Sequence, residues 1–268
     1  MKLNKQPILL IRISKKEYNK TLLEDFKVYM NPQLGFSEKK DLTSGQFDPN
    51  EGLVFSNPFR LKYSTDQINW TTLINEKDSV SLKRDSHAYI FCMYAVQFDP
   101  TNYNSSAKTY TQIIPWKYIK GFFKEGEASG LEMLIFLDSV AFINILCDAS
   151  VKAGLSCCGQ LISYDLEEKL ADPSYFNDVK NNIFTSVFHK KEKDYSIQNE
   201  YRFSVICHEK PNHLELPIEH LEKAQIQVMD IFENQDIILT FHNVKLQDNG
   251  HFKSFSGIKI NFVNVSAQ

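Results

Sequence analysis

The chain has 268 residues, of which 43% are hydrophobic, 13% aromatic and 24% charged, and its formal net charge is -3. These proportions are typical of a folded soluble protein and exclude a chain that is disordered over most of its length. Lysine and arginine together number 30 against 33 acidic residues, so the overall charge does not favour nucleic acid as a partner.

The chain begins with a pattern that predicts a strand followed by a helix. Pro7 to Ile13 is an apolar run rich in β-branched residues, which predicts the strand. Ser14 stands at the N-cap position of the next segment, and Glu17 completes a capping-box pattern. We therefore expect a helix from Lys15 to about Asp25, then a short strand from Lys27 to Met30. The apolar side chains that we expect on the inner face of this helix recur every four residues: Tyr18, Leu22 and Phe26.

The middle of the chain predicts a buried sheet and one long helix. Ala88 to Phe98 is almost continuously apolar and aromatic, which predicts a central strand covered on both faces. Leu131 to Leu137 predicts another buried strand, and a short helix is expected between Gln112 and Phe123. Ser139 to Lys152 predicts a helix that ends near Gly154. Its expected inner face consists of Val140, Ile143, Cys147 and Val151.

The last third of the chain predicts strands separated by turns. Apolar and polar residues alternate from Tyr201 to Cys207, as in a strand that is covered on one side. A turn at Lys210 to Asn212 leads to His213 to Leu216, which we expect to be its hairpin partner. Three further strands are expected at Ala224–Val228, Ile237–His242 and Gly257–Phe262. Because no linker divides the chain, the sequence predicts a single α+β domain over residues 1–268, with a mixed, mainly antiparallel sheet flanked by helices.

The cysteines and the hydropathy pattern indicate a cytoplasmic protein. Five cysteines form no CxxC pair and make an odd total, which favours free thiols in a reducing compartment. Cys157 and Cys158 are interpreted as small buried hydrophobes. The apolar run before Arg12 has about five residues, shorter than that of a signal peptide. No window is apolar enough for a membrane helix, so we expect no membrane association.

Several well-known sites lack their spacing in this chain. The sequence has no GxGxxG, GxxxxGK[ST], GxSxG or HExxH motif, which excludes the dinucleotide fold, the P-loop, the esterase elbow and the zincin site built on those motifs. The seven histidines include no pair four residues apart. His208 is the only one beside a cysteine, and in a strand those two side chains point to opposite faces, so we expect no metal site.

Three features are candidates for a functional site. Arg12 lies near the end of an apolar strand, where its guanidinium could grip a phosphate group, or form a salt bridge at the edge of the core. Gln198 and Glu200 precede a strand and would face one cavity if the backbone between them is extended. Asp48 and Glu51 are concentrated in a turn before Gly52, which turn formation alone also explains.

Glu200 is the candidate catalytic residue. A carboxylate so placed can hold a ribose hydroxyl and stabilise an oxocarbenium-like centre while a glycosidic bond breaks. The amide of Gln198 could orient the acceptor. The alternative is a solvated turn in which Glu200 pairs with Arg202. Because we expect Glu200 to be exposed at the start of a strand, we expect Glu200→Ala to leave the fold intact.

Arg12, the Tyr63-Ser64-Thr65 segment and the Gln198-Asn199-Glu200 segment, in this order, resemble the Arg, Ser-Thr-Ser and Gln-x-Glu signature of mono-ADP-ribosyltransferases. Asp66 stands where that signature has its last serine. The resemblance implies an ADP-ribosyltransferase-like fold and NAD as the substrate. It implies that Glu200 holds the nicotinamide ribose and that Gln198 helps to choose the acceptor.

The same resemblance gives NAD-binding roles to Arg12, Tyr63 and Ser64, and we add Asp48 and Glu51 of the nearby turn as further candidates for binding the dinucleotide. The acceptor would be a host or phage protein, or a nucleic acid. Four segments also resemble a group of uncharacterised bacterial and phage proteins encoded near mobile-element and phage-defence genes: Lys27–Asn31, Phe47–Gly52, Phe91–Tyr94 and Tyr195–Arg202.

Two other classes of function stay open at the level of sequence. One is a metal-dependent nuclease toxin in which Asp48, Glu51 and Glu200 hold a divalent ion. The other is a binding or sensor protein without enzymatic activity, which acts in a conflict between phage and host and uses part of its aromatic content at an interface.

Overall fold

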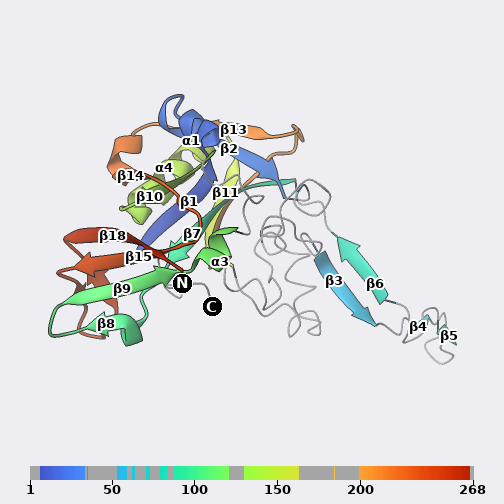
Figure 1. The fold of residues 1–268 in the computed structure, drawn as a ribbon. Coiled ribbons are helices and arrows are strands. Elements are labelled where there is room, and N and C mark those ends of the chain that lie inside the picture. The colour runs from blue at the N-terminus through green and yellow to red at the C-terminus, as the bar shows by residue number, and fades with distance from the viewer. Residues whose placement is uncertain are drawn as a thin grey trace.

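The computed structural model describes residues 7–33, 35, 53–58, 62–63, 71–72, 79–83, 87–120, 130–162, 184 and 199–265. Its main body has three layers: helices, an eight-stranded sheet, and a four-stranded sheet (Figure 1). The strand pairs in both sheets are antiparallel. The predicted α+β class with a mainly antiparallel sheet is confirmed.

The eight-stranded sheet has the strand order β11-β12-β7-β1-β10-β14, and β2 and β13 are attached to it along β7. Its strands have the following bounds: β1 (Leu9–Lys15), β2 (Lys27–Pro32), β7 (Ala88–Val96), β10 (Leu131–Phe136), β11 (Ser156–Leu161), β12 (Glu200–Ile206), β13 (Leu214–Pro217) and β14 (Ile226–Asp230).

Strand β7 lies at the centre of the sheet and is buried on both faces, as its sequence predicts. Phe91 and Met93 point toward the helices, and we call their side of the sheet the helical face. Ile90 and Val96 point to the opposite side, which we call the sandwich face because part of it packs against the four-stranded sheet. A strand with apolar side chains on both faces is stable only where two layers cover it.

The sheet divides at one edge of β7. Strand β1 pairs with β7 only as far as Ile11, which lies opposite Tyr94. Beyond that point the same edge of β7 is taken by β2, whose Asn31 lies opposite Ile90. The outer edge of β1 then pairs with β10, and that of β2 pairs with β13. Two branches therefore leave β7, and we call the place where they part the fork.

Helix α4 (Ser139–Lys152) covers the helical face and has the predicted bounds. The carboxylate of Asp138 accepts a hydrogen bond from the backbone N–H of Ala141 at 2.8 Å, which caps the helix. The predicted inner face is wrong at both ends, because Val140 and Val151 are exposed. The stripe that packs inward is displaced around the helix and consists of Phe142, Ile145, Leu146 and Ala149.

Helix α1 (Lys16–Leu23) follows β1, but its predicted cap and inner face are largely wrong. The Ser14 hydroxyl does not cap the helix, and it donates instead to the side-chain oxygen of Asn19 at 2.5 Å. Asn19 is fully buried and donates in turn to Glu132 on β10. Of the three residues expected inside only Leu22 is buried, since Tyr18 and Phe26 are about half exposed. A polar network therefore fixes the buried side of this helix.

The four-stranded sheet has the order β18-β15-β9-β8, and its inner residues pack against Leu9, Ile11 and Met133 on the sandwich face. The strands expected near 237–242 and 257–262 are confirmed. The short helix expected between Gln112 and Phe123 is present as α3 (Trp116–Ile119), and β9 occupies the first residues of that range. The bounds of the four strands are β8 (Tyr103–Asn104), β9 (Thr109–Ile114), β15 (Gln235–His242) and β18 (Gly257–Asn264).

The remaining described elements are short. In the described ranges they are three two-stranded pairs and two 3-10 turns: β3 (Leu53–Pro58) with β6 (Ser79–Lys83), β4 (Lys62–Tyr63) with β5 (Thr71–Thr72), β16 (Lys245–Leu246) with β17 (Phe252–Ser254), η1 (Pro100–Asn102) and η5 (Leu221–Ala224). Among the helices that the structure describes, none has the length and apolar content needed to cross a membrane.

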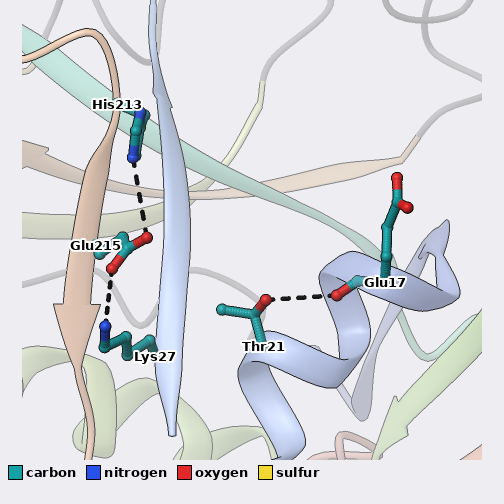
Figure 2. A network of polar contacts seen from close by, with 5 residues as sticks. All are labelled: Glu17, Thr21, Lys27, His213 and Glu215. Carbon is teal, nitrogen blue, oxygen red and sulfur yellow. Dashed lines mark hydrogen bonds and ion pairs between the residues drawn. The ribbon is translucent and has the colours of Figure 1, made fainter. Parts of the chain in front are cut away.

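Strand β13 does not form the predicted hairpin with β12. It pairs with β2, and Glu215 lies opposite Tyr29. The Glu215 carboxylate lies 3.0 Å from the Lys27 ammonium and 3.8 Å from His213, as Figure 2 shows. Exposed ion pairs of this kind stabilise a fold only slightly. The partner is different because both edges of β12 are occupied, one by β7 and the other by β11.

Gly159 lets two strands pack closely at the outer end of the sheet. On β11 it lies opposite Phe203 of β12, and the ring of Tyr201 crosses the space where a side chain would be. A Cβ atom at Gly159 would lie 2.4 Å from the Tyr201 hydroxyl oxygen and 3.3 Å from a ring carbon of Phe203. Tyr201 is itself buried, so its ring has little room to move.

We expect Gly159→Ala to lower the free energy of unfolding by about 1–3 kcal/mol, because Tyr201 must shift within a packed core. Gly257→Ala, at the start of β18, is the matched control, since nothing lies within 4 Å of its added Cβ. Urea denaturation of both variants measures the difference. Equal stability of the two variants would contradict this account of the β11–β12 contact.

Candidate functional site

Glu200 and Arg202 form an ion pair inside the eight-stranded sheet. The Arg202 Nε–H donates to a Glu200 carboxylate oxygen at 2.9 Å. The two side chains are 7% and 2% exposed, which makes this a buried pair and not a solvated one. The pairing is the one considered as an alternative from the sequence, but the expectation of an exposed Glu200 is wrong. Strand β12 is buried at all seven positions, not only on one side.

The ion pair lies on the sandwich face. Tyr201, Phe203 and Val205 of β12 belong to the core under the helices, so the alternate residues Glu200, Arg202 and Ser204 point the other way. On β7, Tyr94 lies opposite Glu200 and Cys92 lies opposite Arg202. On β11, Gln160 lies opposite Arg202 and Cys158 opposite Ser204. A row of polar groups thus crosses three strands, from the buried residues of β12 to the exposed Gln160 on β11.

Asn199 fixes the position at which β12 begins. Its φ of 37° lies in the left-handed region, which asparagine tolerates better than most residues. Its carbonyl accepts a hydrogen bond from the N–H of Ala95 at 2.8 Å, and its side-chain amide donates to the Ala95 carbonyl. Because the backbone at Asn199 is not extended, the argument that placed Gln198 and Glu200 on one side does not hold. Gln198 itself lies outside the described residues.

Tyr94 is the neighbour of Glu200 on the central strand. Burial raises the pKa of its hydroxyl to about 12, and a hydrogen bond with the Asn199 side chain opposes this shift. Tyr94 therefore stays protonated at neutral pH and remains a hydrogen-bond donor beside Glu200. A neutral phenol next to a fixed carboxylate can donate to a ligand oxygen without adding charge.

Ser204 leaves one hydrogen-bonding group open in the row. The residue is fully buried, and its hydroxyl has no hydrogen-bond partner among the residues that the structure describes. A buried hydroxyl without a partner costs roughly 1–3 kcal/mol of folding free energy, and a hydrogen bond from a ligand or an ordered water would remove this cost.

The nearby cysteines are poor candidates for a nucleophile. All five are free thiols. Burial raises the pKa of Cys147 to about 12, and the hydrogen-bonded thiol of Cys157 adds to this shift. Burial also raises the pKa of Cys158. Because the thiolate is the reactive form, Cys147 and Cys158 are poor nucleophiles at neutral pH. Cys157 and Cys158 are half-buried, so the expectation that both are buried is not met in full.

Arg12 does not share a face with Glu200. It lies two residues after Leu10 in β1 and therefore points to the same helical face as Leu10. Its guanidinium carbon lies 4.1 Å from the centre of the Phe91 ring on that face. Glu200 points to the sandwich face. The sheet itself therefore separates the two charged groups that the sequence placed in one pocket, and the salt bridge considered for Arg12 is absent from the described residues.

The other predicted site residues are not brought to Glu200 by the described structure. Tyr63 lies in β4, where only the backbone is described. Asp48, Glu51 and Ser64 lie outside the described residues, as does Gln198. Within the described part of the chain, no three or more His, Cys, Asp or Glu residues are grouped so as to hold a metal ion.

Sequence reasoning missed Tyr94, Asn199 and Ser204. Tyr94 was assigned to a buried strand, but without the register it could not be placed opposite Glu200. Ser204 was one of the polar residues of an alternating strand, and its spacing of two from Arg202 was the available signal.

A comparison with known proteins finds no family model, no curated protein and no solved structure that matches the chain.

The burial of the ion pair changes the expected effect of Glu200→Ala. The substitution removes the carboxylate that Arg202 hydrogen-bonds inside the sheet, and breaking such a buried pair costs about 3–5 kcal/mol of unfolding free energy. A cycle of the parent, Glu200→Leu, Arg202→Met and the double variant tests the pair. The double variant removes both charges and should lose less stability than the sum of the two single losses. Urea denaturation of the four proteins measures this coupling. A loss below about 1 kcal/mol in Glu200→Ala would contradict the buried pair.

Proposed function

We propose that the chain consumes NAD, as a mono-ADP-ribosyltransferase or an NAD glycohydrolase, and that Glu200 is its catalytic carboxylate. The observation that carries the proposal is the buried carboxylate of Glu200, which Arg202 orients at the first residue of β12. A charged group that is held in place away from water stabilises an opposite charge far better than the same group in solvent.

In the proposed reaction the bond between the ribose C1′ and the nicotinamide nitrogen breaks. Nicotinamide leaves as a neutral molecule with the electron pair of that bond, and positive charge develops on the ribose. Glu200 stabilises this charge. Water then attacks C1′ in a glycohydrolase, whereas a nucleophile of a host or phage protein, or of a nucleic acid, attacks it in a transferase. The attacking group loses its proton to solvent.

The NAD contacts that we propose differ from those expected from the sequence in one respect. Because Arg12 points to the helical face, NAD bound at Glu200 would be held by groups of the sandwich face such as Tyr94 and Ser204. The roles of Gln198, Tyr63, Ser64, Asp48 and Glu51 remain part of the proposal. Five free thiols agree with a proposed site of action in the bacterial cytoplasm, during a conflict between phage and host.

A second candidate function is a binding or sensor protein without turnover. One observation favours it: Glu200 and Arg202 neutralise each other in the interior of the sheet, as in a purely structural pair. Large apolar side chains on the surface, such as Phe232 and Phe26, which are about half exposed, would then serve a protein interface.

The test is incubation of the purified protein with NAD labelled in its adenylate half, together with host extract and nucleic acid. Nicotinamide release and transfer of the label are measured. We expect Glu200→Gln to lower turnover about 10²–10³-fold, because the amide keeps the shape of the side chain but not its charge. Glu215→Gln, on the exposed strand β13, is the matched control and should retain activity.

Thermal unfolding first establishes that each variant is folded. Full turnover by folded Glu200→Gln would contradict the catalytic role of Glu200. No nicotinamide release by the parent protein, combined with a stable complex with a host or phage protein, would favour the binding function.

A further inference from the structure

Arg12 lies at the fork of the eight-stranded sheet. Ile11 is the last residue of β1 that pairs with β7, and Arg12 is the next one along the chain. The edge of β7 is not paired with β2 until Ile90. Between these points, β1 turns toward β10 and β2 toward β13. Arg12 therefore lies where the edge of β7 passes from β1 to β2.

The guanidinium of Arg12 is largely, but not completely, shielded from solvent. It lies over the face of Phe91, 4.1 Å from the ring centre, while part of the residue remains accessible to solvent. Desolvation lowers the pKa of Arg12 to about 10, and a weaker interaction with Cys92 acts in the opposite direction. The side chain is therefore still positively charged at neutral pH.

Within the described part of the chain, no carboxylate pairs with this charge. Arg12 has no ion pair and no side-chain hydrogen bond among those residues, and its guanidinium makes a cation–π contact with Phe91. Arg202 lies two strands away in the same sheet and shows the usual solution, a hydrogen-bonded carboxylate at 2.9 Å. A desolvated cation without a counter-ion is unfavourable, so its presence requires an explanation other than stability.

We propose that the fork is an anion-binding site in which Arg12 holds the phosphate or carboxylate group of a ligand. The guanidinium presents a planar set of donors that matches either group with two parallel hydrogen bonds. Phe91 supports one face of the guanidinium and leaves its edge for the anion. The site lies on the helical face, on the opposite side of the sheet from Glu200, and is independent of the proposed reaction there.

The first measurement compares Arg12 with the fully buried Arg202. Arg12→Met removes an uncompensated charge, so we expect the unfolding temperature of this variant to equal or exceed that of the parent protein. Arg202→Met breaks an ion pair and is expected to lower the unfolding temperature by roughly 6 °C or more. Differential scanning calorimetry in chloride buffer without phosphate measures both. If Arg12→Met falls as far as Arg202→Met, Arg12 already has an anionic partner in its own chain, and the proposal is wrong.

The second measurement titrates inorganic phosphate, pyrophosphate and glutarate into the parent protein at constant ionic strength. We expect at least one of these anions to raise the unfolding temperature of the parent and of Glu200→Gln, but not that of Arg12→Met. Arg12→Lys keeps the charge without the paired donors and should show a smaller shift. A preference for pyrophosphate over glutarate would indicate a phosphate-bearing ligand, and the reverse preference would indicate a carboxylate.

An equal response of the parent and Arg12→Met to every anion would overturn the site, because the effect would then be a general salt effect. The result does not depend on NAD turnover. If Arg12→Met loses the anion response but keeps NAD turnover, the anion site is independent of the Glu200 site. If the parent protein binds anions but shows no NAD turnover, the anion site is supported and the proposed reaction is not.

Discussion

A charged side chain that is removed from water costs free energy unless it is paired, and two arginines of one sheet differ in how they are paired. Arg202 is enclosed with Glu200, and the pair sits in a layer where every residue of β12 is buried. Arg12 lies over Phe91, and no carboxylate of the described residues pairs with it. The Glu200–Arg202 pair is compensated within the chain. The charge of Arg12 would be compensated by the anion that we propose.

The three layers make both arrangements possible. Strand β7 is apolar on both faces, so helices cover one side and further structure covers the other. Its two edges contact β12 on one side and both β1 and β2 on the other. The buried ion pair and the fork are thus adjacent to the same strand, but they open to opposite faces of the sheet. The two proposed sites are therefore separated by the sheet, whereas the sequence analysis placed Arg12 and Glu200 in one pocket.

Elements with a strong local signal could be predicted from the sequence, and long-range arrangement could not. The apolar run of β7 and the helix α4 were found with nearly correct bounds, because burial on both faces of a strand and a helical apolar period that ends near Gly154 leave a clear pattern. The partner of β13 was wrong because β11 already occupies the free edge of β12, which no local signal reveals. The relative faces of Arg12 and Glu200 depend on the register between strands, which is set by packing across more than 100 residues of chain.

The most direct test of this account is the NMR spectrum of the arginine side-chain Nε–H groups, which is simple because the chain contains only four arginines. The signals of Arg12 and Arg202 are assigned from the two methionine variants and followed during a pyrophosphate titration. The account predicts that the Arg12 signal shifts and saturates, while that of Arg202 stays in place because Glu200 already holds it. A shift of Arg202 with no change in Arg12 would contradict it.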